Sequence, residues 1–147
     1  MRSKWWGWGR EDESFHLPNP DGFWSYVRDR LGKTEPTERL ESPSEITVPP
    51  GRVADVIVAE LSGVVGAQSV STDGAARAVF SLGKGYKDLV RIRRGEVPDA
   101  TDVVVTPDTE EHVLEVLRLA RRHGLAVIPF GGGTSVVGGV EPAGDRP

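Results

Sequence analysis

Hydrophobic and polar residues follow their clearest pattern between residues 101 and 130. The β-branched run "DVVVTP", residues 102–107, predicts a short buried strand that ends at its proline. Residues 108–123 repeat apolar positions at helical spacing, and "LAVIPF", residues 125–130, predicts a second strand. Strand, helix and strand over about thirty residues predict a right-handed βαβ unit with parallel strands.

The helix of this unit carries start and stop signals. Asp108 and Glu111 have the spacing of a capping box, and Gly124 suits the left-handed position that ends a helix. The basic residues of the last turn stabilise the helix, because their positive charge lies near the negative end of the helix dipole. The expected apolar face consists of Val113, Val116, Leu117 and Ala120.

Upstream of residue 97 the pattern is weaker. "DGFWSYVRDRLG" predicts a helix with Asp21 as its cap, Gly32 at its end and an apolar stripe. Residues 33–51 hold four prolines and predict an extended connector, and a helix is expected over roughly 52–62. Residues 89–94 alternate in a way that permits a short strand. The stripe would consist of Phe23, Trp24, Val27 and Leu31.

Two groups of side chains, the N-terminal tryptophans and a run of arginines, are candidates for a binding role. Trp5, Trp6 and Trp8 lie within the first ten residues, and we expect this arm to pack on a core or on a partner subunit because exposed tryptophan is costly. A platform for an aromatic ligand is the alternative. The arginines at 91, 93 and 94 are expected to form a solvated face, with contact to an anionic ligand as the alternative.

Composition excludes several classes of function. With 147 residues, 37% hydrophobic and 27% charged, the chain is expected to be a soluble globular protein with room for one ordinary domain. A net charge of −4 gives no electrostatic case for binding nucleic acid. The absence of cysteine excludes disulfides and thiolate metal sites. Neither a signal peptide nor a membrane-spanning stretch is apparent, so a cytoplasmic location is expected.

The glycine-rich stretch "AVIPFGGGTSVVGGV" follows the second expected strand, where open α/β sheets tend to bind ligands. Glycines let the backbone approach a ligand, and successive N–H groups can then converge on a pyrophosphate. No lysine follows as in a nucleotide-triphosphatase loop, and the spacing from Gly131 lacks the sixth-position glycine of the Rossmann fingerprint. A glycine-rich turn without a ligand is the alternative.

The segment from Pro98 to Val140 resembles the opening of the FAD-binding domain of the vanillyl-alcohol oxidase / p-cresol methylhydroxylase superfamily. Within it, "KWWGWG" and "YKDLVRIRRGEVPDA" resemble the alkyldihydroxyacetonephosphate synthase group, whose members act in ether-lipid synthesis. The expected class is therefore α+β. A tryptophan-rich helical region would occupy residues 1–96, and the start of an incomplete FAD-binding domain would occupy residues 97–147.

The resemblance implies which residues contact FAD. The loop residues that match are Pro129, Phe130, Gly131, Gly132, Gly133, Thr134 and Ser135, with Gly138 and Gly139 shaping the exit. Some relatives attach FAD through a histidine where this chain has Thr134, so non-covalent FAD is expected. His16, His112 and His123 are expected to be surface residues, and the sequence indicates no metal site and no catalytic residue.

A complete domain of this superfamily continues well beyond the glycine loop, so the chain is expected to be an N-terminal piece that is inactive alone. The parent would be a flavoenzyme with a lipid-precursor or other small-molecule substrate. It would be either an alkyldihydroxyacetonephosphate synthase or an FAD-linked oxidase or dehydrogenase of 2-hydroxy acids. A non-catalytic fragment is the remaining alternative. The family and the tryptophan arm also lead us to expect a homodimer.

Overall fold

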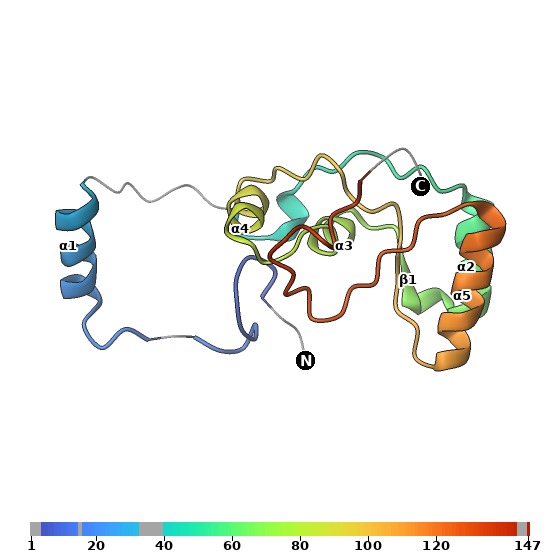
Figure 1. Cartoon of the computed structure of the whole chain (residues 1–147), viewed down its shortest axis with the longest axis horizontal. Helices are drawn as coiled ribbons and strands as arrows, with labels where there is room; N and C mark the ends of the chain where they lie inside the picture. Colours follow the sequence, from blue (N-terminus) through green and yellow to red (C-terminus); the bar gives the residue numbers. More distant parts are fainter. Residues whose placement is uncertain (1–3, 15, 33–39, 144–146) are drawn as a thin grey trace.

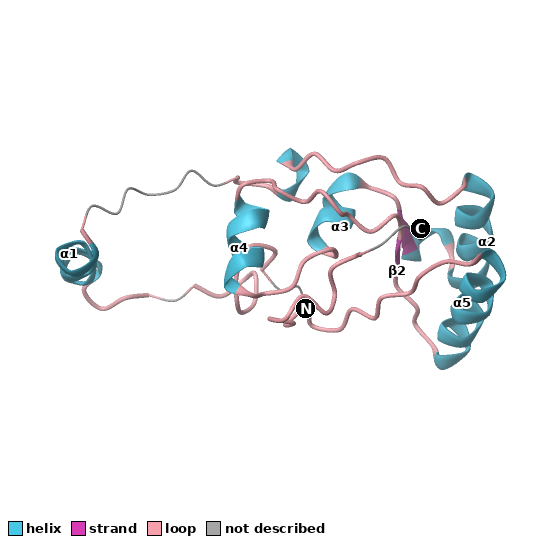
Figure 2. Ribbon diagram, turned by 45° about the horizontal axis from the view of Figure 1, so that its top comes forward, coloured by secondary structure: helices cyan, strands magenta, loops and turns pink. Residues whose placement is uncertain are grey.

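The computed structural model describes residues 4–14, 16–32, 40–143 and 147, and its helices are arranged along one long axis (Figure 1). Helix α1 lies at one end, α3 and α4 lie in the middle, and α2 and α5 lie side by side at the other end (Figures 1 and 2). The first part of the expected connector, 33–39, lies outside the described residues. The α-helices are α1 Pro20–Leu31, α2 Asp55–Val65, α3 Gly74–Val79, α4 Tyr86–Arg93 and α5 Glu110–His123. Two 3₁₀ turns span Pro43–Glu45 and Ala67–Ser69.

The core lies in the middle of the molecule. Ile46, which lies within the expected connector, packs with buried apolar side chains on or just after α3 and α4, and partly buried side chains cover them. Trp5 is one of these covering residues, which confirms that the N-terminal arm packs on a core. Trp8, by contrast, is half exposed. The buried members are Ile46, Ala78, Leu82, Ile92 and Val97.

The sheet has two short strands, β1 Val70–Ser71 and β2 Val104–Val105, which pair antiparallel. The α+β class is confirmed, but the expected parallel βαβ arrangement is wrong. Residues 125–130 form no strand, because a strand needs a hydrogen-bonded neighbour. Among the described residues, their backbone makes one bond outside the end of α5, from the Ala126 N–H to the Pro147 carbonyl at 2.8 Å.

Helices α1 and α5 are capped by polar side chains as expected, but the capping residues lie one or two positions from the expected ones. Thr109, rather than Asp108, caps α5 by accepting the His112 N–H at 3.1 Å. Asn19, rather than Asp21, caps α1 by accepting the Gly22 N–H. Both glycines expected to end these helices do so with positive φ, and α2 begins three residues later than expected.

The apolar faces of α1 and α5 differ from the expected ones. In α5 the buried residues are Leu119 and Ala120, since α5 packs on α2, while Val113 and Leu117 are nearly half exposed. Helix α1 buries none of its residues.

Residues 86–93 form helix α4, where a short strand had been permitted. The Asp88 carboxylate accepts a hydrogen bond from the Gly85 N–H at 3.1 Å and so caps the start of the helix. This bond between residues three apart stabilises a helix and has no counterpart in a strand. Arginine positions 91 and 93 therefore lie on a helix that packs on the core through Ile92.

A buried arginine holds two extended segments beside the core. Arg77 on α3 is 5% exposed; its Nε donates to the Thr101 carbonyl at 2.7 Å and its Nη2 to the Pro49 carbonyl at 2.8 Å. Ser81 adds to this network by accepting the Thr101 N–H at 2.7 Å. The chain that leads into β2 is thereby fixed against the middle of the molecule.

Candidate functional site

The glycine loop, defined as residues 129–139, leaves space where the sequence predicted a ligand. A Cβ atom built on Gly131 would meet no atom within 4 Å, and one on Gly132 would meet only the Thr134 methyl at 3.7 Å. Both glycines are exposed and neither has a positive φ. The chain itself therefore does not require glycine at these two positions.

The start of the loop carries a run of backbone hydrogen-bond donors. Within the described part of the chain, none of the backbone N–H groups of residues 131–134 donates to another residue. Such groups must be satisfied by water or by a ligand. Successive backbone N–H groups can bind an anion when they point to the same side of the chain.

Gly133 has a different role from its two neighbours. It is buried with φ of +64°, and a Cβ here would lie 2.4 Å from Cζ of Phe130. The Phe130 ring in turn packs edge-on against Phe80, with ring centroids 4.9 Å apart. Phe130 thus lies beneath the loop as support, and Gly133 is needed for the turn above it.

The exit of the loop is closed by local bonds. Ser135 Oγ accepts the Gly139 N–H at 3.1 Å, and the Gly138 carbonyl accepts the Glu141 N–H at 3.1 Å. Gly138 has φ of +75°, which explains its residue type. The Glu141 carboxylate pairs with Arg91 of α4 at 2.6 Å, so this arginine ties the loop exit to the core helix instead of forming a solvated face.

The segment Gly83–Lys84–Gly85 supports the loop from below. The Lys84 N–H donates to the Ser135 carbonyl at 2.7 Å. A Cβ on Gly83 would lie 2.2 Å from that carbonyl oxygen, and one on Gly85 would lie 3.1 Å from the carbonyl oxygen of Val136. Sequence reasoning missed this segment, although two glycines flanking one lysine are a signal of close backbone approach.

The Lys84 side chain reaches in the other direction, toward the N-terminal arm. Its Nζ donates to the carbonyl of Lys4 at 2.5 Å and to that of Trp5 at 3.3 Å. Burial lowers the pKa of the Lys84 ammonium, because the surroundings disfavour its charged form. One lysine therefore contacts the arm through its side chain and the glycine loop through its backbone.

Aromatic and cationic side chains hold the rest of the arm. The Arg93 guanidinium lies 4.8 Å from the Trp6 ring centroid, a cation–π distance. The Trp6 ring is therefore already engaged by the chain's own arginine. A pocket of about 390 Å³ lies beside this ring, lined by Lys4, Trp5, Trp6, Glu11, Glu13 and Ser14, so the aromatic-ligand platform stays an untested alternative.

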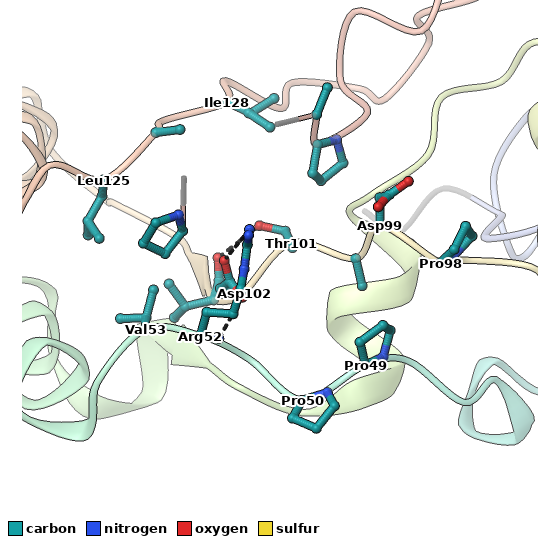
Figure 3. A pocket seen from close by; sticks show the side chains of 16 residues that line it. Pro49, Pro50, Arg52, Val53, Pro98, Asp99, Thr101, Asp102, Leu125 and Ile128 are labelled. Atoms are coloured by element: carbon teal, nitrogen blue, oxygen red, sulfur yellow. Dashed lines mark hydrogen bonds and ion pairs between the residues drawn. The ribbon is translucent and has the colours of Figure 1, made fainter. Parts of the chain in front are cut away.

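A separate pocket of about 260 Å³ lies between residues 49–53, residues 98–103 and the start of the extended segment 125–128 (Figure 3). Arg52 and Asp102 pair across its wall, with the Arg52 N–H 2.7 Å from Asp102 Oδ1. None of the glycine-loop residues lines it. The pocket and the loop are therefore distinct features.

In the described ranges no group of three or more His, Asp or Glu side chains could hold a metal ion. His123 lies 3.1 Å from Glu60 of α2, so it joins two helices as a half-buried residue, while His16 is exposed. No helix in the described part of the chain is long and apolar enough to cross a membrane.

A family model described as "FAD binding domain" matches residues 101–145. The chain is 34% identical to alkyldihydroxyacetonephosphate synthase of Trypanosoma brucei brucei and 28% identical to that of Dictyostelium discoideum. Each match covers 95% of the chain, and the two cover 26% and 27% of the relatives. The chain thus spans about a quarter of the length of these curated relatives.

Solved structures of alkyldihydroxyacetonephosphate synthase also match the chain over nearly its whole length. Two crystal forms of alkyldihydroxyacetonephosphate synthase match 98% of the chain, with TM-scores of 0.81 and 0.82 and 28% sequence identity. The chain covers 32% and 30% of those structures. The similarity therefore includes the helices, the core and the glycine loop together.

Proposed function

We propose, from the premise that residues 101–145 are part of an FAD-binding domain related to that of alkyldihydroxyacetonephosphate synthases, that the glycine loop binds the pyrophosphate of FAD. The donors would be the backbone N–H groups of residues 131–134. The Thr134 hydroxyl would add another donor. Pro129 would set the approach to the loop, and Ser135, Gly138 and Gly139 would fix its exit.

One observation carries this proposal: consecutive N–H groups with no hydrogen-bond partner among the described residues lie beside two glycines that the described fold does not need. A side chain at Gly131 or Gly132 would occupy space that the protein leaves empty. A diphosphate needs such space to come within hydrogen-bond distance of backbone nitrogen atoms. The residues present therefore fit FAD.

The residues of the loop would bind and orient the cofactor. FAD, when bound, supplies the hydride or covalent chemistry that ordinary side chains lack. Thr134 stands where some relatives carry the histidine that bonds to flavin, and a threonine hydroxyl can hydrogen-bond without forming that link. We therefore propose that FAD is held non-covalently.

Nuclear magnetic resonance of the ¹⁵N-labelled chain tests the proposal, because it detects weak binding. FAD and ADP, which both carry a pyrophosphate, should shift the amide signals of residues 131–134 in a saturable way. AMP should shift them less, and riboflavin should leave them unchanged. Unchanged signals with millimolar FAD, or equal shifts with riboflavin, would contradict a pyrophosphate site.

The variant Gly131→Ala separates binding from folding. Its methyl group meets no atom within 4 Å, so the thermal unfolding temperature should stay unchanged. FAD affinity should fall at least about tenfold, as expected for loss of a hydrogen bond to a charged group. Gly132→Val should act in the same direction with a larger effect. Gly63→Ala, on the exposed side of α2, is the matched control and should leave FAD affinity unchanged.

Acid denaturation tests the mode of attachment. The flavin should leave the precipitated protein completely and remain in the supernatant. Yellow colour retained by the washed precipitate would show a covalent bond and overturn the non-covalent assignment.

Other expectations for the whole flavoenzyme also remain proposals. Similarity to named synthases favours a lipid-precursor substrate over a 2-hydroxy acid. The division into residues 1–96 and 97–147, the homodimer and the cytoplasmic location rest on the sequence. An assay with an acylated dihydroxyacetone phosphate and a long-chain alcohol, run beside one with 2-hydroxy acids, would distinguish the two substrates.

A further inference from the structure

We propose that Lys84 is a positioning residue that couples the N-terminal arm, residues 4–10, to the glycine loop and thereby sets its affinity for FAD. This inference rests on the proposed function. It adds a role for the arm and for a buried lysine, neither of which belongs to the loop.

The first step is the contact between Lys84 and the arm. The lysine is 9% exposed, and its ammonium donates to two successive carbonyls, those of Lys4 and Trp5. Burying an ammonium costs free energy unless hydrogen bonds compensate it. The two carbonyls supply that compensation, so the position of Lys84 depends on the arm being in place.

The second step is the fit between the Lys84 backbone and the loop. The Lys84 N–H donates to the Ser135 carbonyl at 2.7 Å, directly after residues 131–134, the proposed pyrophosphate donors. The glycines on both sides lie too close to the loop carbonyls for a side chain. A shift of this segment would therefore move the loop with it.

The third step is what holds the arm. Trp5 packs on the buried core, Arg93 covers the Trp6 ring, and the Lys4 N–H bonds to the Gly9 carbonyl at 3.0 Å to close the arm into a turn. Figures 1 and 2 show the N-terminal arm beside α4. The arm is thus a fixed support on which Lys84 depends.

The test measures the FAD dissociation constant from the amide shifts of residues 131–134 in a double-mutant cycle. Lys84→Met keeps the length of the side chain but removes its donors, and should weaken FAD binding about fivefold, at the low end of typical coupling between sites. Lys84→Arg keeps donors for both carbonyls and should restore most of the affinity. In a chain that begins at Glu11, Lys84→Met should have no further effect.

Trp6→Ala provides a second background, because it removes the contact with Arg93 but leaves Trp5 on the core. The effect of Lys84→Met should shrink there as well. A merely structural role would lower the unfolding temperature in every background without this dependence on the arm.

Three results would overturn the coupling, and a fourth would overturn the proposed function as well. Unchanged affinity in Lys84→Met, while the parent chain binds FAD, contradicts it and leaves the proposed function intact. An equal loss with and without the arm would mean that Lys84 supports the loop independently of the arm. No rescue by arginine would point to packing alone. Absence of FAD binding in the parent chain would overturn the proposed function and this inference with it.

Discussion

Gly83 and Ser135 are in such close contact that a Cβ atom on the glycine would lie 2.2 Å from the carbonyl oxygen of the serine. The backbone φ of Gly83 is not positive, so the requirement for glycine comes from space and not from strain. Residues 52 positions apart in the sequence therefore fix each other, and the base of the glycine loop depends on a segment outside it.

Gly83→Ala should displace the loop. The methyl group must push the Ser135 carbonyl away, which breaks its bond with the Lys84 N–H. We expect a loss of about 1–3 kcal/mol in the free energy of unfolding, typical of overpacking, and a parallel loss of FAD affinity. Urea unfolding followed by circular dichroism measures the first quantity and amide shifts measure the second.

Gly63→Ala serves as the control, since an added Cβ meets nothing within 4 Å on the exposed side of α2. Alanine in a helix interior should stabilise the protein by up to about 1 kcal/mol. If both alanine variants behave alike, the close contact at Gly83 does not determine the position of the loop.

Arg77→Lys should destabilise the chain although the charge is kept. A guanidinium donates through two nitrogen atoms at once to the carbonyls of Pro49 and Thr101, and an ammonium cannot span both. Loss of one charged hydrogen bond should lower the free energy of unfolding by about 2 kcal/mol in a urea titration. The exposed Arg118→Lys should change it by less than about 0.5 kcal/mol, and a similarly small effect at Arg77 would refute the bridging role.

The Arg91–Glu141 pair should contribute a measurable coupling energy. Both side chains are about three-quarters buried, so solvent screens their 2.6 Å contact only in part. A double-alanine cycle in thermal unfolding should give about 1 kcal/mol, reduced in 1 M salt. The exposed Glu115–Arg118 pair on α5 is the comparison and should give about 0.3 kcal/mol. Equal values for the two pairs would mean that Arg91 does not hold the loop exit.

Local sequence signals predicted α1, α2 and α5 but not α3 or α4. Gly32 and Gly124 end α1 and α5 as expected, both with positive φ, because such a helix end needs little beyond a residue without a Cβ atom. Caps were displaced by one or two residues, to Asn19 and Thr109, because neighbouring polar side chains compete for the same N–H groups.

Strand pairing could not be predicted in the same way. The run around Val104 was expected to pair with a parallel neighbour, but its partner is Val70–Ser71, and the pairing is antiparallel. Apolar runs do not identify their partner strand, since the partner depends on which distant segments the core brings together. Likewise, Ala120 is buried as predicted, but Leu119 and not Leu117 lies beside it in the buried face of α5, because α2 packs there.

The sequence by itself determined the α+β class, the C-terminal ends of α1 and α5 and the presence of a glycine-rich loop, because these depend on residues close together in the chain. Only the tertiary structure decided what holds that loop. Gly83, Lys84 and Arg91 reach it from other parts of the chain, and their roles depend on distances that no local pattern encodes. Hydrogen bonds and excluded volume act between neighbours in space, so the support of the loop becomes apparent only after the chain has folded.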